Sequence, residues 1–191
     1  MAENFIREIH QILFQGVNAI KIGFPGRERT IRIVGGEYKK HGNHVLKADG
    51  TIHYYSPAIA VSAEMSELVA WYFQNHQIIH PRGISAKVHH EITRIHPFTD
   101  GNGRVARLVM NLILMANNYP PAIIKNDEKE TYYNALENAD KGNLKPFTKI
   151  VRTEVEKTID VILGIVGGKS QNEQGRVARR NFPSRLPQAR T

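Results

Sequence analysis

The chain has 191 residues, 41% of them hydrophobic, and a formal net charge of +8. Its size predicts one compact domain, and the absence of cysteine excludes disulfides and thiolate metal sites. No basic segment followed by a long apolar run opens the chain, and no stretch approaches the roughly 18 apolar residues of a membrane-spanning helix. We therefore expect a soluble, cytoplasmic protein, with export into a host cell by a non-classical route left open.

Six segments have apolar residues at helical spacing, and strand-like segments are few. The predicted helices cover roughly residues 3–20, 58–75, 84–95, 103–117, 128–139 and 144–165. Ser85 is a candidate N-cap for the third of these helices. Residues 45–55 contain two short strand-like runs joined by Asp49-Gly50, a pair that suits a tight hairpin turn. The sequence therefore predicts an all-α fold with one small β-hairpin.

Basic residues are concentrated at the carboxyl end. Residues 167–191 hold six Lys or Arg and one Glu, so this segment contributes +5 and leaves +3 on the rest of the chain. It begins with two glycines, contains Pro183 and Pro187, and has few apolar residues, which is typical of flexible chain. We therefore divide the chain into a folded domain over 1–166 and a basic, flexible tail over 167–191.

The most chemically informative stretch is His96-Pro97-Phe98-Thr99-Asp100-Gly101-Asn102-Gly103-Arg104-Val105-Ala106-Arg107. It leads into the predicted helix over 103–117, so its glycine-rich turn lies at a helix N-terminus, where unpaired N–H groups and the dipole favour an anion. Gly101 and Gly103 allow successive N–H groups to converge on one point. Pro97 disfavours a continuing helix, so the preceding helix is expected to end here.

The ionisable side chains of this stretch suit work on a phosphate. His96, with an ordinary pKa of about 6.5, can accept a proton near neutral pH. Asp100 can bind Mg²⁺, which typically takes one or two carboxylates together with phosphate oxygens. Arg104 and Arg107 are three residues apart, so they share a helix face and can contact phosphate oxygens. The stretch therefore predicts a site that binds a nucleotide and activates a hydroxyl.

The pattern His-Pro-Phe-x-x-Gly-Asn-Gly-Arg-x-x-Arg resembles the motif of active Fic domains at every fixed position. Fic domains are mainly helical. The resemblance implies a protein adenylyltransferase that transfers AMP from ATP to a Ser, Thr or Tyr hydroxyl of a target protein and releases pyrophosphate. A related branch phosphorylates its target, but its loop departs from the second-glycine pattern, so Gly103-Arg104 favours nucleotidyl transfer. A Fic-type transferase with another donor, such as UTP or CDP-choline, stays open as an alternative.

The resemblance also implies roles for the motif residues. His96 is expected to be the general base, and Asp100 is expected to bind Mg²⁺, the expected cofactor. Phe98 is expected to face the core and anchor the loop. The expected nucleotide- and phosphate-binding residues are Phe98, Gly101, Asn102, Gly103, Arg104, Arg107, Tyr132 and Tyr133.

Within that set the implied roles differ. The Gly101-Asn102-Gly103 segment is expected to form an anion hole. Arg104 is expected to contact the triphosphate, and Arg107 is expected to orient the γ-phosphate. Tyr132 and Tyr133 lie in a segment that matches the helix walling the adenine pocket in Fic domains, although their spacing alone indicates amphipathic core or rim residues.

A β-hairpin flap covers the active site of Fic domains and pairs with the backbone of the target protein. Residues 26–32, Gly-Arg-Glu-Arg-Thr-Ile-Arg, resemble a segment that precedes this flap. The hairpin over residues 45–55 is therefore expected to be the flap, and edge-to-edge pairing is the expected mode of docking. The expected docking residues are Thr51, Ile52, His53, Tyr54 and Tyr55.

Two other classes of protein compete with this interpretation. A metal-dependent hydrolase would use His89, His90, Glu91 and His96, but these residues lack the i, i+4 spacing of a helical zinc pair, so the first two are expected at the helix surface or core edge. A non-catalytic binding module would use the basic tail to bind nucleic acid. Nucleic acid is not expected as a partner except through that tail.

One regulatory pattern of Fic proteins is missing from the sequence. Many of them carry an inhibitory helix with Ser/Thr-x-x-x-Glu-Gly/Asn, whose Glu pairs with the second motif arginine, here Arg107. No Ser or Thr in this chain is followed four residues later by Glu, and the nearest match, Ser170 to Gly175, has Gln174 at that place. A neutral amide cannot form the charge-assisted pair. We therefore expect an antitoxin-like inhibitory partner, an inhibitory segment elsewhere, or constitutive activity.

Overall fold

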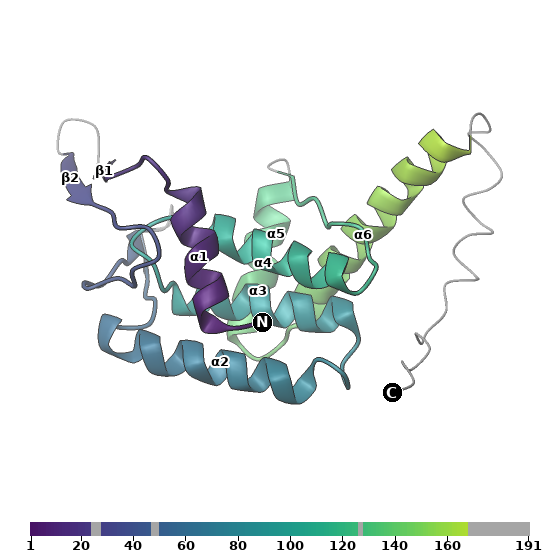
Figure 1. The fold of residues 1–191 in the computed structure, drawn as a ribbon. Coiled ribbons are helices and arrows are strands. Elements are labelled where there is room, and N and C mark those ends of the chain that lie inside the picture. Colours follow the sequence, from purple (N-terminus) through teal and green to yellow (C-terminus); the bar gives the residue numbers. More distant parts are fainter. Residues whose placement is uncertain (24–27, 47–49, 126–127, 168–191) are drawn as a thin grey trace.

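The computed structural model describes residues 1–23, 28–46, 50–125 and 128–167. Helices dominate the described chain (Figure 1), and a short 3-10 turn, η1 (Ala58–Ala60), leads into the second of them. The helices are α1 (Glu3–Leu13), α2 (Val61–Asn75), α3 (Pro81–Ile95), α4 (Asn102–Ala116), α5 (Lys129–Asp140) and α6 (Lys145–Val166). The predicted mainly helical fold is confirmed.

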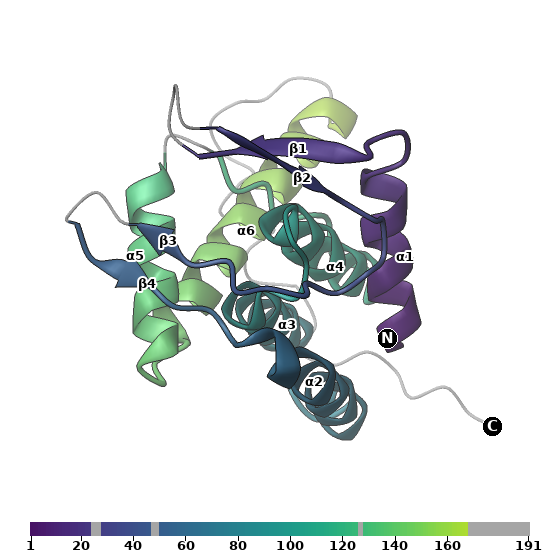
Figure 2. The ribbon, with the colours of Figure 1, turned by 90° about the vertical axis from the view of Figure 1, so that its left-hand side faces the viewer.

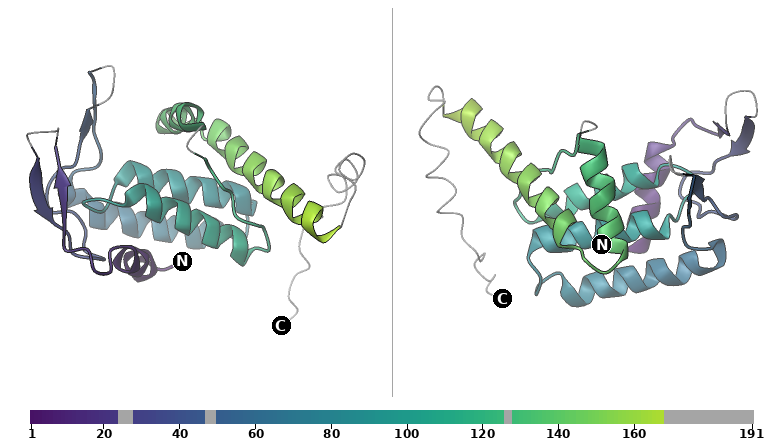
Figure 3. Two further views of the ribbon diagram at one scale, coloured as in Figure 1. Left: turned by 90° about the horizontal axis from the view of Figure 1, so that it is seen from above. Right: turned by 180° about the vertical axis from the view of Figure 1, so that it is seen from behind.

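Two antiparallel strand pairs lie on the same side of the helical body (Figures 1 and 3). β3 (Val45–Leu46) pairs with β4 (Ile52–His53), so the predicted hairpin is present with shorter strands than expected. Asp49 of its expected turn lies outside the described residues. The other pair, β1 (Ala19–Ile22) with β2 (Arg29–Arg32), was not predicted.

The unpredicted pair corrects the first helix, which ends at Leu13 and not near residue 20. Val17 and Ile20 continue the apolar spacing, but Gly16 takes the left-handed conformation, with φ +81°, and the chain turns there. Residues 19–22 then pair with residues 29–32, with Ile20 opposite Ile31. Periodicity cannot separate these outcomes, because a partner strand supplies the hydrogen bonds that a helix would make internally.

The third helix starts one turn earlier than the sequence predicts. Its N-cap is His80, whose Nδ1 accepts a hydrogen bond of 3.2 Å from the Arg82 N–H, and Pro81 occupies the first helical position. Proline suits this position because its missing N–H would have no intrahelical partner there. Ser85 lies within the helix and donates to the Arg82 carbonyl at 3.1 Å, so it is not the cap.

Helix α3 is the central element, since it contacts α2, α4, α5 and α6. One set of its residues packs with α1, α2 and α4 (Figure 2): Ile84, Val88, Ile92 and Ile95. Its Ala86 belongs to a second core, which includes Met110 of α4, Tyr132 of α5 and Phe147 of α6. Because α3 is held between two cores, its carboxyl end is a rigid base for the motif that follows.

The end of α6 projects from the body (Figures 1 and 3), and its residues 161–166 are exposed. The predicted basic tail from residue 168 onward lies outside the described residues. Among the described helices, none combines the length and apolar character needed to cross a bilayer.

Candidate active site

The backbone turns sharply at His96, the residue that follows the last turn of α3. Its N–H donates to the Ile92 carbonyl at 3.0 Å, and its own φ of 52° and ψ of 59° are left-handed. This conformation is uncommon for a residue other than glycine. It directs the chain out of α3 and into the motif loop, which ends at the start of α4.

Phe98 and Asn102 hold this loop from inside. The Asn102 amide accepts from the Phe98 N–H and donates to the Phe98 carbonyl, both at 2.8 Å. The Phe98 ring is fully buried and stacks on His10, with ring centroids 3.9 Å apart and planes 4° from parallel. The expected core-facing position of Phe98 is thus observed. Because both side chains face the protein, each would reach a nucleotide through its backbone only.

The start of α4 combines a glycine packed against Phe14 with N–H groups that have no partner within the helix. Gly101 is its N-cap in the left-handed conformation, with φ +78°, and a Cβ there would lie 2.5 Å from Cε2 of Phe14. Val105 is the residue whose N–H bonds back to the Gly101 carbonyl, at 2.9 Å. The N–H groups of residues 102–104 precede that first helical bond, so they are oriented toward an anion placed at the helix start.

Asp100 and Arg104 form an ion pair at the mouth of this turn. Arg104 Nη2 lies 3.3 Å from Asp100 Oδ2, and both side chains are about half exposed. The guanidinium also lies over the ring of Phe14, 4.8 Å from its centroid. The Asp100 carboxylate is therefore at the surface next to the helix N-terminus, where it could exchange its arginine partner for a cation.

Arg107 has different neighbours from Arg104. The backbone geometry at Gly103 places a Cβ 3.7 Å from Arg107 Nη1, so the guanidinium reaches back over the first turn of α4. Burial raises the pKa of Tyr132 to about 12, and the nearby Arg107 charge and hydrogen bond oppose that shift. The Tyr132 hydroxyl also lies 3.3 Å from Nε2 of His89. Arg104 thus lies at the surface beside Asp100 and Phe14, whereas Arg107 lies near the buried Tyr132.

The two tyrosines of α5 are also in separate environments. Tyr132 is buried in the second core, whereas Tyr133 is about half exposed. The Tyr133 hydroxyl is near enough to Tyr55 of the flap to raise the pKa of that phenol, after the larger effect of burial. Of the pair, Tyr133 is thus the more exposed side chain and the one that acts on the flap.

The flap reaches the motif histidine directly. The Tyr55 ring stacks on the His96 ring with centroids 3.7 Å apart and planes at 20°. His53 packs edge-on against Tyr55, with centroids 4.7 Å apart. Thr51, Ile52 and Tyr54 are exposed. The expected docking residues therefore fall into two groups. Three of them face outward, whereas Tyr55 lies against the motif histidine and His53 packs against Tyr55.

The environment of His96 favours a neutral imidazole. Burial lowers its pKa to about 4, and the charges of Lys39 and His53 act in the same direction, against the Thr93 carbonyl and Asp100. Nδ1 lies 3.4 Å from the Thr93 carbonyl oxygen, which favours a proton on Nδ1. Nε2 would then carry the free lone pair at neutral pH, as a general base requires.

His89 and His90 are buried, contrary to the expected surface or core-edge positions. His89 meets Tyr132, and His90 Nε2 lies 2.9 Å from Oδ1 of Asp140. Within the described ranges, no three His, Cys, Asp or Glu side chains come together as a metal-binding cluster. In the part of the chain that the structure describes, the residues proposed for a metal-dependent hydrolase thus do not converge on one metal site.

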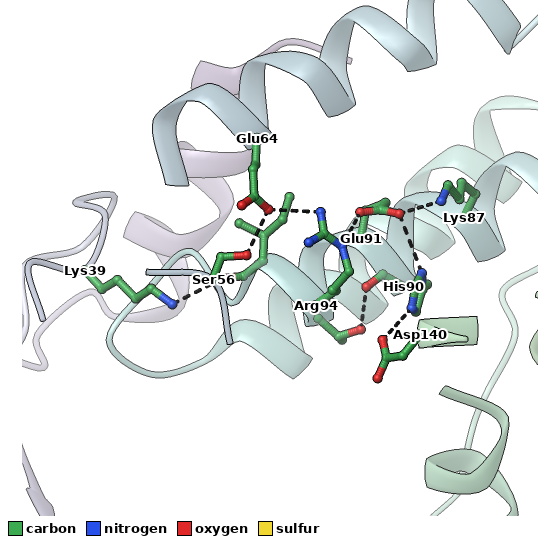
Figure 4. Close-up of polar contacts among 10 residues, drawn as sticks. Lys39, Ser56, Glu64, Lys87, His90, Glu91, Arg94 and Asp140 are labelled. Carbon is green, nitrogen blue, oxygen red and sulfur yellow. Dashed lines mark hydrogen bonds and ion pairs between the residues drawn. The ribbon is translucent and has the colours of Figure 1, made fainter. Parts of the chain in front are cut away.

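A polar network that the sequence analysis missed lies beside the flap (Figure 4). Ser56 donates to Glu64 at 2.8 Å, and Arg94 bridges Glu64 and Glu91 at 2.9 and 2.8 Å. Burial alone would raise the pKa of Glu91, but the neighbouring His90 and hydrogen bonds from Lys87 and Arg94 hold it far below its usual range. The network joins the end of the flap to α2 and α3. No spacing rule connects residues 56, 64 and 94, so only the structure could bring them together.

A helical body, a motif loop at the start of α4 and a two-stranded flap over the motif histidine together define a Fic domain. The chain belongs to the Fic/DOC family, since the sequence model of that family matches residues 1–114. The match ends within α4, so α5 and α6 lie beyond it.

Curated relatives agree with this assignment. Protein adenylyltransferase Fic of Drosophila melanogaster is 34% identical over 136 residues, which cover 69% of this chain and 26% of the fly protein. The protein of the same name in Drosophila virilis is 35% identical over the same length. The chain thus spans about a quarter of the length of these relatives.

Solved structures confirm the fold. A Fic domain containing signaling protein from Bacteroides thetaiotaomicron superposes with a TM-score of 0.75 and 28% identity, over 91% of this chain and 66% of that one. Fic-1 of C. elegans, residues 134–508, has a TM-score of 0.69 and 27% identity, over 89% of this chain and 45% of that one.

Proposed function

We propose that this protein is a protein adenylyltransferase, which transfers AMP from ATP to a hydroxyl group of a target protein. The observation that carries the proposal is the partly buried His96, whose lowered pKa favours a neutral ring, next to an N-terminus of α4 that no described side chain caps. A proton acceptor and an anion-binding turn are the two groups that hydroxyl attack on a nucleotide phosphate requires. The names of the Drosophila relatives support the same reaction.

His96 acts as the general base in the proposed reaction. Its Nε2 takes the proton from a Ser, Thr or Tyr hydroxyl of the target while Nδ1–H stays on the Thr93 carbonyl. The hydroxyl oxygen forms a bond to the α-phosphorus of ATP, and the bond from that phosphorus to the bridging oxygen breaks. Pyrophosphate leaves with the electron pair.

The start of α4 binds the polyphosphate in this proposal. The N–H groups of residues 102–104 bind phosphate oxygens without the cost of reorganisation, because Gly101 and Asn102 already hold the turn. Arg104 contacts the triphosphate and Arg107 orients its γ-phosphate. Gly103 leaves the approach to the first turn open.

Asp100 fits a magnesium ion that arrives with the nucleotide. It offers one accessible carboxylate next to the phosphate-binding turn, and a hard oxygen ligand of this kind is what Mg²⁺ prefers when phosphates supply other ligands. Bound there, the ion would neutralise part of the polyphosphate charge. Asp100 would then give up its contact with Arg104, which frees the guanidinium for phosphate.

The target protein docks on the flap in this proposal. β3 and β4 form a pair with exposed strand residues Val45 and Ile52, so an extended target segment can add its backbone to the pair. Tyr55 stacks on the face of the His96 ring, so the chain that follows β4 contacts the proposed base.

Substituting His96 tests the chemistry. We expect His96→Ala to lower the rate of transfer by at least about 10²–10⁴-fold, the usual contribution of a positioned base. ATP binding measured by calorimetry should change little, since the phosphate-binding groups remain. The control is His41→Ala, at an exposed histidine, which should transfer at the wild-type rate. Equal rates for wild type and His96→Ala would contradict the assigned role.

Intact mass separates the possible donors. After incubation with Mg²⁺ and a candidate target, ATP should add one adenylyl group to the target. If ATP does not react, but UTP adds a uridylyl group or CDP-choline adds phosphocholine, the protein is not an adenylyltransferase. It would then be a Fic-type transferase that uses another donor at the same phosphate site.

A further inference from the structure

Lys39 is a buried lysine outside the motif, in the segment that joins β2 to β3. Only 4% of the surface of Lys39 is exposed, which is unusual for lysine. Figure 4 shows its side chain extended toward the group formed by Ser56, Glu64 and Arg94. A buried ammonium is costly unless its protons are bonded, so its partners indicate what it does.

The partners of Lys39 flank His96 on both sides. The Lys39 N–H donates to the Pro97 carbonyl at 2.8 Å. Its ammonium donates to the Ile95 carbonyl at 3.2 Å and to Oδ1 of Asn43 at 2.8 Å. One residue therefore binds the chain immediately before and immediately after the motif histidine.

Asn43 binds the chain one residue further along. Its Nδ2 donates to the Phe98 carbonyl at 2.9 Å. The same carbonyl accepts from Asn102 inside the loop. Together, Lys39 and Asn43 bind three carbonyls around His96, those of Ile95, Pro97 and Phe98.

The turn at His96 requires such support. A left-handed residue other than glycine is strained, and it persists only where its surroundings hold it. The Ile95 carbonyl is also at the negative end of α3, where a cation is favoured. The ammonium therefore stabilises both the helix end and the turn.

Lys39 also lies close to the ring stack of the site. Its Nζ is 6.0 Å from the centroid of the Tyr55 ring, and that ring covers His96. The carboxylate of Glu64, from α2, also acts electrostatically on the ammonium. The charged and titratable groups facing Lys39 are thus Glu64, Tyr55 and His96.

We propose that Lys39 is a positioning residue, which with Asn43 holds the backbone turn of His96 and keeps its ring beneath Tyr55, so that Nε2 faces the target hydroxyl. The inference rests on the proposed function, because the direction of Nε2 matters only if His96 accepts a proton. Lys39 itself touches no reacting atom in this mechanism.

The charge of Lys39 should also make kcat depend on pH. Burial lowers the pKa of its ammonium to about 8, with Glu64 acting in the opposite direction. The ammonium is protonated at neutral pH and loses its proton as the pH rises through about 8. We therefore expect kcat of the wild-type protein to fall above that pH.

The test compares Lys39→Met with Lys40→Met, a change at the adjacent and largely exposed lysine. Lys39→Met should lower kcat by about 10–100-fold, the scale expected for a small misplacement of a catalytic group. KM for ATP should stay the same, and the fall of kcat above pH 8 should disappear. Lys39→Arg should recover most of the activity and move the alkaline fall upward. Lys40→Met should match the wild type.

A second readout does not depend on activity. In NMR spectra of ¹⁵N-labelled protein at pH 7, wild-type His96 should show a single neutral Nδ1–H form. Lys39→Met should show a mixture of forms, which Lys39→Arg should reverse. If the wild type transfers no nucleotide, the proposed function fails, but this measurement still tests Lys39.

Folding of each variant is checked by its thermal unfolding midpoint. If Lys39→Met does not fold, Asn43→Ala replaces it, because that change keeps the ammonium and removes the bond to the Phe98 carbonyl. A folded variant with wild-type kcat, an intact alkaline fall and an unchanged His96 spectrum would overturn the proposal.

Discussion

Single residues of the motif loop divide into those that shape it and those that face outward. Phe98, Gly101 and Asn102 shape it, through a buried ring, a left-handed turn and two internal hydrogen bonds. Asp100 and Arg104 are at its surface and pair with each other. The motif loop thus contains residues whose loss should affect folding and others whose loss should affect ligand binding, and stability measurements distinguish them.

The two motif glycines should respond differently to alanine. Gly101→Ala forces a side chain into a left-handed turn and against the buried Phe14 ring, so we expect a loss of about 2–4 kcal/mol in unfolding free energy. Gly103→Ala is the matched control, because it lies within α4 and its Cβ would meet only Arg107 at 3.7 Å. It should gain about 0.5–1 kcal/mol. Chemical denaturation measures both, and equal stabilities would contradict the assigned geometry.

At the level of elements, α3 both builds the core and positions the motif histidine. Its middle supplies apolar residues to both cores, and its last turn leads into His96. Two further histidines, His89 and His90, are buried along it. Burial lowers the pKa of His89 to about 3, helped by the charge of Arg107 and by His90. A neutral imidazole at this position is therefore part of the folded structure.

This burial predicts acid sensitivity. The unfolded chain binds a proton on His89 near pH 6.5, whereas the folded protein does so only near pH 3. The contribution of the neutral His89 to the unfolding free energy is therefore fully present above pH 6.5 and is lost as the pH drops toward 3. We expect His89 to account for about 1–2 kcal/mol of the loss between pH 6.5 and 5. His96, with its pKa of about 4, adds to the same trend.

Denaturation of His89→Gln at several pH values measures this contribution. Its unfolding free energy should depend less on pH than that of the wild type, even if the variant is less stable at pH 7. Substitution of the exposed His41 by Gln should leave the pH dependence unchanged. An identical slope for His89→Gln and the wild type would show that His89 is not the responsible group.

At the scale of the whole molecule, the described chain is a Fic domain without a recognised inhibitory segment. The sequence contains no Ser/Thr-x-x-x-Glu, and the chain spans about a quarter of its curated relatives. We therefore propose that any inhibitor acts from another chain, as an antitoxin-like partner would, or from sequence outside these 191 residues.

Removal of residues 168–191 tests whether the tail restrains the domain. We expect self-labelling with α-³²P-ATP to proceed at the same rate with and without this segment, since Gln174 cannot supply the charge that would displace a γ-phosphate. Strong activation by truncation would show that the tail inhibits. Nucleic acid binding compared between the same two proteins would show whether the tail has an accessory role.

Features that depend on neighbouring residues could be predicted from the sequence. The spacing of His96, the two glycines and the two arginines specified the family, and apolar periodicity located the six helices, because both are properties of neighbouring residues. The same reasoning extended the first helix past Gly16, where a partner strand decided the outcome.

The contacts between distant side chains at the site could not be predicted, because they form only when the chain folds. Lys39 binds a carbonyl 56 residues away, and Tyr55 of the flap covers His96. Neither contact has a signature in spacing, because it depends on how the pre-flap segment packs across the end of α3. The chemistry of the motif is therefore local, whereas its geometry depends on contacts that form only when the whole chain folds.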